Sequence, residues 1–138
     1  MASRSGPEWI GFEVVPQAIK LYHQICTGSL PLSAFHPIAM PKVRWRRQTR
    51  DGSDEINHQG VDVVRDAIRK HWLKPFAKID IQPDNKVAHS VGLKPEYLWY
   101  GITYQLVGTT KSGEEVNWWC SSEYHLTGDK FEWITEKV

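Results

Sequence analysis

The sequence predicts an α+β domain in which helices pack against one side of a curved antiparallel sheet. Three observations lead to this prediction. Apolar residues recur at helical spacing in residues 15–27 and 61–72, a hairpin signal separates these two segments, and residues 97–136 have the pattern of three consecutive strands. Helices that precede a run of antiparallel strands are typical of the α+β class.

Composition indicates one ordinary globular domain. The chain has 138 residues, a net charge of +1 and seven Trp, so no strong field favours nucleic acid or a membrane surface. Cys26 and Cys120 do not have the spacing of a disulfide framework or a metal site, and the histidines show no ligand spacing. We find no signal-peptide pattern and no bilayer-spanning segment, so we expect a cytoplasmic protein. We also expect no metal site, because neither the cysteines nor the histidines have ligand spacing.

The first half of the chain divides into an arm, a helix and a hairpin. Residues 1–13 are expected to form an N-terminal arm that precedes a single domain at 14–138. A helix is predicted over 15–27, with Gly28 as its C-cap, and a short helical turn within 29–41, where three prolines interrupt the chain. Asp51-Gly52 predicts a hairpin between strands 42–49 and 55–59. One face of that hairpin carries Val43, Trp45, Arg47, Ile56 and His58.

The middle of the chain predicts a second helix and two short strands. Apolar residues place a helix over 61–72, and Pro75 follows its end. Residues 77–83 and 85–92 are expected to pair with each other through the turn at Pro83-Asp84-Asn85.

The last three strands are expected to share one aromatic face. A turn centred on Lys111 would pair Leu98 with Tyr124 and Tyr104 with Trp118, and a turn over Gly128-Asp129 would pair Tyr124 with Trp133. The resulting face carries Leu98, Tyr100, Ile102, Tyr104, Leu106, Trp118, Cys120, Ser122, Tyr124, Phe131 and Trp133. An apolar wall with several phenols and a hydroxyl is more typical of a ligand-lining sheet than of a plain core.

Two segments carry a resemblance to a known superfamily, namely INHQGVDVVRDAIRKHW and SSEYHLTGDKFEWITEK. With the order of elements, over roughly residues 14–137, they resemble the nuclear transport factor two-like superfamily, which includes SnoaL-like polyketide cyclases and ketosteroid isomerases. The resemblance implies a cone-shaped, cystatin-like α+β barrel whose pocket lies between sheet and helices, often without a cofactor. It also implies a homodimer through the convex face, where we expect Trp99 and Trp119. The catalytic sets of the related dehydratases and epoxide hydrolases are not found.

Four residues are candidate catalytic groups. His58 would transfer a proton, because histidine titrates near neutrality. Tyr100 and Tyr104 would hold a carbonyl or enolate oxygen, as an oxyanion hole does. Arg47 would hold a carboxylate or polarise a carbonyl. The alternatives are a core histidine bonded to the backbone, two core tyrosines, and an arginine that reaches water.

Seven further residues are expected to line the pocket and contact the substrate. Indoles and phenols stack on flat ligands, although core packing alone also accounts for several of them. The predicted substrate-binding residues are Tyr22, Trp45, Trp72, Trp118, Ser122, Tyr124 and Trp133.

These observations lead to one principal function and two alternatives. The first is a cofactor-independent isomerase or cyclase that uses acid–base chemistry on a hydrophobic, polycyclic metabolite of natural-product biosynthesis. The second is a dimeric ligand-binding or scaffold module without catalysis, which the outward Trp99 and Trp119 would favour. The third is an accessory subunit of a larger enzyme.

Overall fold

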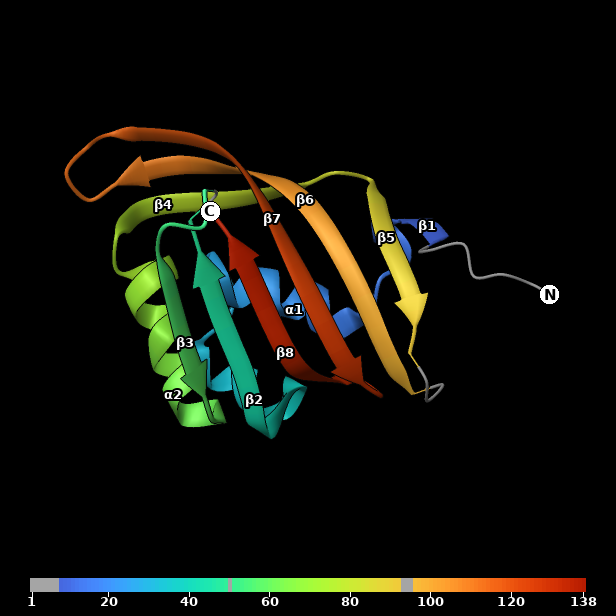
Figure 1. Ribbon diagram of the computed structural model, residues 1–138. Coiled ribbons are helices and arrows are strands. Elements are labelled where there is room, and N and C mark those ends of the chain that lie inside the picture. Colours follow the sequence, from blue (N-terminus) through green and yellow to red (C-terminus); the bar gives the residue numbers. More distant parts are fainter. Residues whose placement is uncertain (1–7, 50, 93–95) are drawn as a thin grey trace.

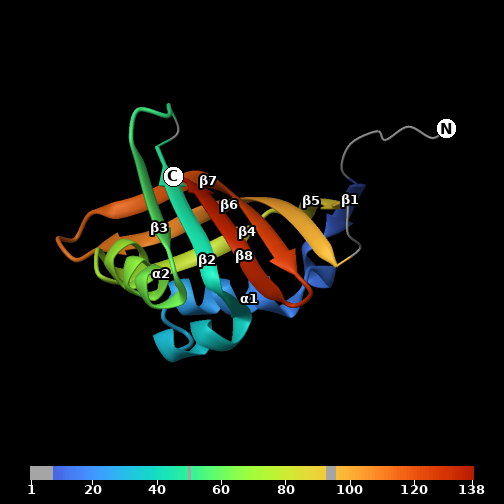
Figure 2. The same ribbon diagram turned by 60° about the horizontal axis from the view of Figure 1, so that its bottom comes forward.

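The computed structural model describes residues 8–49, 51–92 and 96–138, which form one curved sheet with helices on one side (Figures 1 and 2). The strands run in the order β1-β5-β6-β7-β8-β2-β3, and β4 pairs with a second stretch of β6. Their bounds are β1 Glu8–Gly11, β2 Ala39–Gln48, β3 Glu55–Gln59, β4 Phe76–Pro83, β5 Lys86–Val91, β6 Tyr97–Thr110, β7 Glu115–Thr127 and β8 Lys130–Lys137. The predicted α+β class is confirmed.

Both predicted helices are present, as α1 Gln17–Cys26 and α2 Val61–Ile68, and short helical segments cover Phe12–Val14, Leu32–Ile38 and Arg69–Leu73. Helix α1 buries Ile19, Tyr22 and Ile25 against the sheet. After α2 the chain continues in a wider π-helical turn, which places Trp72 in the core at 1% exposure. The turn extends the helical region to the end that the sequence predicts.

The hairpin of β2 and β3 has the predicted register, with Trp45 opposite His58 and Arg47 opposite Ile56. Its neighbour on the other side is β8, which runs parallel to β2 and pairs Arg47 with Glu136. All other strand pairs of the described chain are antiparallel.

The prediction that residues 77–83 pair with residues 85–92 is wrong. Strand β6 has 14 residues, and it pairs with β5 along its first part and with β4 along its second part. The approach of β4 depends on Gly108, because a Cβ at that position would lie 2.1 Å from the carbonyl oxygen of Lys78. Strand β5 also pairs with β1, so the described part of the N-terminal arm is the edge of the sheet.

The predicted register between β6 and β7 is wrong by two residues. Leu98 lies opposite Leu126, and Tyr104 lies opposite Cys120, because the turn is centred one residue later than Lys111. Gly113, with a φ of 95°, donates its N–H to the Thr110 carbonyl in this turn. Since side chains alternate with a period of two, the shift leaves every residue on its predicted face.

A bulge between β7 and β8 changes the face of the final residues. Leu126 pairs with Phe131 as predicted, but the register then shifts, and His125, in place of Tyr124, lies opposite Trp133. Trp133 therefore points to the outer face, while Ile134 and Glu136 point inward. No helix of the described residues is long and apolar enough to cross a membrane.

Candidate functional site

A buried carboxylate lies at the centre of the most polar cluster in the interior. Glu136 on β8 has no exposed surface, and its Oε1 accepts hydrogen bonds from Nη2 and Nε of Arg47 at 3.0 and 3.3 Å. The two residues face each other across the parallel strands β2 and β8. Burial by itself lowers the pKa of Arg47, but the facing carboxylate more than compensates and raises it. The guanidinium of Arg47 therefore keeps its charge at neutral pH.

Aromatic donors complete the shell around Glu136. Trp72 Nε1 lies 2.9 and 3.0 Å from the two carboxylate oxygens, and the Tyr22 hydroxyl donates to Oε2 at 2.5 Å. Trp45 Nε1 in turn donates to the Tyr22 oxygen at 3.2 Å. Burial and the nearby charge of Glu136 raise the pKa of Tyr22 well above its usual value, so this phenol keeps its proton. We call Tyr22, Trp45, Arg47, Trp72 and Glu136 the carboxylate cluster.

Two further hydrogen bonds join phenols in the same interior. The Tyr104 hydroxyl lies 2.9 Å from Ser122 Oγ, and the Tyr124 hydroxyl lies 2.9 Å from His23 Nε2. Burial lowers the pKa of His23 to about 4, so its ring is neutral at physiological pH. These contacts place Ser122, Tyr104 and Tyr124 inside, as predicted.

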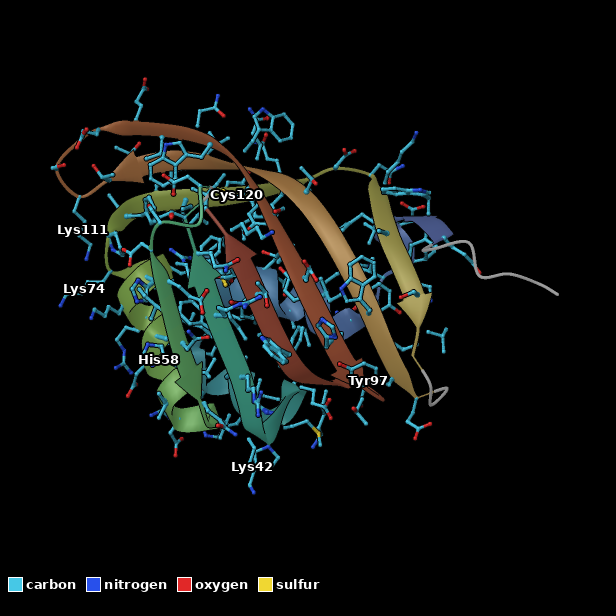
Figure 3. All side chains as sticks on the ribbon, in the orientation of Figure 1. Lys42, His58, Lys74, Tyr97, Lys111 and Cys120 are labelled. Atoms are coloured by element: carbon cyan, nitrogen blue, oxygen red, sulfur yellow. The ribbon has the colours of Figure 1, made fainter. Side chains whose placement is uncertain are left out.

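The predicted catalytic residues do not converge on one point. Tyr100 stacks on His89 at 4.5 Å between ring centroids, and it lies about 13 Å along β6 from Tyr104 at a strand rise of about 3.3 Å per residue. His58 lies on β3, beside α2 in Figure 3, and stacks on Trp45 at 5.8 Å. Because β2, β8 and β7 separate β3 from β6, His58 does not meet the two tyrosines. The predicted oxyanion pair and its proton donor are therefore not assembled, and only Arg47 joins the carboxylate cluster.

Two of the predicted substrate-binding residues lie elsewhere. Trp118 is 49% exposed near the turn end of β7, with its ring against Phe76 at 6.3 Å. Trp133 lies on the outer face because of the bulge, 6.1 Å from the His125 ring. Trp118 thus keeps its predicted face but lies beyond the buried part of the sheet, whereas Trp133 lies on the opposite face from the predicted one.

The interior is more densely filled than the sequence suggests. Tyr22, Trp45, Trp72, Tyr104 and Tyr124 are each at most 1% exposed and pack between the sheet and the helices. They form the core of the region where the sequence predicts a ligand hollow. Their role in substrate binding stays a prediction.

Two cavities lie at the end of the sheet where the chain finishes, and one of them is lined by Arg47 of the carboxylate cluster. The smaller, of about 100 Å³, is lined by Arg47, Ile56 and Val138 among others. The larger, of about 570 Å³, is lined by Asn117, Trp118, Trp119 and Val138. Val138 contributes to both, so the larger cavity neighbours the smaller one that Arg47 lines.

Sequence reasoning missed Glu136 and His23. Strict alternation along β8 predicts that Glu136 lies on the outer face. The strand pattern alone therefore does not predict a buried carboxylate, because it does not include the bulge. The available signal was Arg47, because a buried guanidinium requires an acidic partner. Among the residues that the structure describes, no three side chains of His, Cys, Asp or Glu gather closely enough to hold a metal ion.

Comparisons with known proteins identify the fold. No protein-family profile and no curated protein sequence matches the chain. Solved structures do match, including a nuclear transport factor 2-like protein from Salmonella enterica with a TM-score of 0.69 and 8% identity, over 90% of this chain and 87% of that one. A candidate SnoaL-like polyketide cyclase from Jannaschia matches with a TM-score of 0.63 and 13% identity, over 99% and 90%.

A third match is a type 2 hexachlorocyclohexane dehydrochlorinase, with a TM-score of 0.69 and 9% identity, over 86% of this chain and 78% of that one. The TM-scores of these three matches show a shared fold, and the predicted resemblance to the nuclear transport factor 2-like superfamily is confirmed as a resemblance of fold. Some proteins with this fold are enzymes, so a catalytic role is compatible with it.

Proposed function

We propose that this chain is a cofactor-independent isomerase or cyclase that moves a proton on a hydrophobic, polycyclic ketone, with Glu136 as the proton-transferring group. The observation that carries the proposal is a fully buried carboxylate that is paired with Arg47, whose guanidinium also lines a cavity. Ionisable groups in such an environment are frequent at functional sites. The shared fold supports the proposal through its enzymatic members.

The chemistry assigns separate roles to the two charged groups. The apolar body of the substrate lies in the recess beside Trp118 and Val138, with its carbonyl oxygen at Arg47. Glu136 removes the proton from the carbon next to the carbonyl, and the enolate oxygen that results is stabilised by the guanidinium. The same carboxyl returns the proton to a different carbon, so the double bond moves and no atom is gained or lost. In a cyclase the enolate carbon would instead attack a second carbonyl carbon of the same substrate; the π bond of that carbonyl breaks as the C–C bond forms, and its oxygen takes the proton back from Glu136.

The test uses a β,γ-unsaturated polycyclic ketone as the probe, in buffered D2O. We expect the ultraviolet absorbance of the conjugated enone to appear and deuterium to enter the product. Glu136→Gln should reduce the rate about a hundredfold, within the range for loss of a general base. Exposed Glu132 lies on the same strand, so Glu132→Gln is the matched control and should keep the wild-type rate. Turnover by Glu136→Gln equal to that of the control would contradict the assignment.

A non-catalytic ligand-binding or scaffold module is the second candidate. It is favoured by the complete hydrogen bonding of Glu136, whose two oxygens already accept from three side chains. Such a module would retain the ketone in equilibrium dialysis without deuterium exchange. Retention without exchange in the wild-type protein would favour this candidate over the enzyme.

We also propose that the protein is a homodimer of the cytoplasm, formed through the outer face of β6 and β7. Trp119 is 52% exposed on this face, and exposed indoles are enriched at interfaces. Light scattering coupled to size exclusion should give twice the mass of the 138-residue chain, and Trp119→Glu should give a monomer. Trp9→Glu, on the distant edge strand β1, should not change the mass. A monomeric wild-type protein would end this proposal.

A further inference from the structure

A second polar cavity lies on the outer face of the sheet, and its lining also includes Trp45 of the carboxylate cluster and His58. It has a volume of about 470 Å³ and is lined by Arg44 and Arg46 of β2, Asn57 and Gln59 of β3, and Trp133 of β8, among others. These side chains meet because β3, β2 and β8 are neighbours and Arg44 pairs directly with Gln59 and with Trp133. The bulge that turns Trp133 outward is what completes the wall.

The cavity contains donors that have no acceptor. Arg46 Nε and Trp133 Nε1 are both buried, and neither makes a hydrogen bond within the described chain. A buried N–H without an acceptor costs free energy, so an oxygen ligand at this place would be stabilising. The two side chains belong to adjacent strands and line the same cavity, and a bound acceptor would reach the two covered nitrogens after a small shift of these side chains.

The charge of the cavity is also uncompensated. In the described residues no carboxylate lies within 4.0 Å of a guanidinium nitrogen of Arg44 or Arg46. Glu55 of β3 exerts some attraction on Arg46, but its two oxygens accept from Gln48 and Asn57. The guanidinium carbons of Arg44 and Arg46 lie 5.2 and 6.0 Å from the Trp133 ring centroid. The site thus presents two cations beside a flat apolar surface.

We propose that this cavity binds a small aromatic carboxylate, and that it is a second ligand site. The carboxylate oxygens accept from the guanidinium groups and from the indole N–H, since arginine matches a planar carboxylate in shape and charge. The aromatic ring of the ligand packs against Trp133. Such a site would let an acidic metabolite bind independently of the interior, whatever reaction the interior performs.

The experiment measures binding of 1-naphthoate by titration calorimetry, with 1-naphthamide and inorganic phosphate as comparison probes. We expect saturable binding of naphthoate and at least tenfold weaker binding of the uncharged amide and of phosphate. Arg44→Ala/Arg46→Ala should weaken naphthoate binding at least tenfold. Lys42→Ala/Lys137→Ala removes one exposed charge from β2 and one from β8 and should leave the affinity within twofold. Trp133→Phe, which keeps a ring but loses the N–H, should weaken binding about threefold.

Several results would overturn the proposal. These are equal binding of naphthoate and naphthamide, equal binding of phosphate, or full affinity in a folded Arg44→Ala/Arg46→Ala variant. A fourth result combines two measurements: the wild-type protein binds no naphthoate, and the Arg44→Ala/Arg46→Ala variant has a lower particle mass than the wild-type protein. This result would show that acidic groups of a second copy fill the cavity instead. Glu136→Gln should bind naphthoate normally, which separates this site from the proposed active site.

Discussion

Replacing Glu136 with Met is expected to lower the free energy of unfolding by about 3–5 kcal/mol, the range for breaking a buried ion pair. The substitution leaves the guanidinium of Arg47 buried without its counter-charge, and it removes the acceptor of Trp72 Nε1 and of the Tyr22 hydroxyl. Water cannot replace the lost acceptor easily, because the Arg47 side chain is only 16% exposed and Glu136 is not exposed at all. The loss should be measured by urea denaturation at pH 7.

The double variant Arg47→Met/Glu136→Met separates the cost of the unpaired charge from the value of the pair. Removal of both charges from a buried pair is often neutral, so most of the lost stability should return. Glu132→Met is the control, because Glu132 is exposed on the same strand and its loss should cost less than about 0.5 kcal/mol. If Glu136→Met and Glu132→Met had the same stability, the ion pair would have no structural role.

Local signals were sufficient for the first half of the fold. Residues 15–27 and 61–72 repeat apolar side chains with helical spacing, and the structure has helices there. Asp51-Gly52 lies where two alternating strands meet, and a turn between two such strands leaves only one register that buries Val43 and Trp45 together. In these segments the residues that determine the structure are close together in the sequence.

The same local signals do not predict which distant segments of the chain pair as strands. Residues 77–83 and 85–92 have the pattern of a hairpin, but each finds a better partner in β6, which is long enough for both. Similarly, β2 lies beside β8, which is far away in sequence, and no local pattern indicates a parallel neighbour. Short connections and turn residues determine how segments that are adjacent in the sequence pair. The pairing of β6 with β4 and β5, and of β2 with β8, depends instead on how the whole sheet curves.

The candidate site shows how one inserted residue changes a functional interpretation. Strict alternation along β8 places Phe131 and Trp133 on one face and Glu136 on the other. The bulge after Phe131 reverses this assignment, so Trp133 leaves the interior and Glu136 enters it. His58 was correctly placed beside Trp45, but its distance from Tyr100 follows from the strand order, which the sequence does not state. The donor Arg47 could be predicted, and its acceptor could not.

Acidification is expected to destabilise the protein through His23, whose pKa is lowered from 6.5 to about 4 by burial. Between these two values the unfolded chain binds a proton at His23 and the folded chain does not, so stability decreases as the pH falls through this window. This lowering of the His23 pKa corresponds to roughly 3 kcal/mol of stability, present in full above pH 6.5 and lost near pH 4. The pKa values of His71 and His125 are lowered in the same direction, mainly by burial, and add to the slope.

The variant His23→Gln isolates this contribution, because glutamine does not titrate and still has groups that can bond to the Tyr124 hydroxyl. Urea denaturation at pH 7 and at pH 4 should show that the wild-type protein loses about 3 kcal/mol more than the variant over this interval. His71, His125 and the lowered carboxyl pKa values of Asp51 and Glu55 affect both proteins equally and cancel in the difference. His36→Gln is the control for a histidine-to-glutamine change at an exposed position, beside Asp62. Equal slopes for the wild-type protein and His23→Gln would mean that the buried His23 ring accepts a proton without cost. The structure argues against that outcome, because Phe12 stacks on the ring at 5.8 Å and the Tyr124 hydroxyl contacts its Nε2.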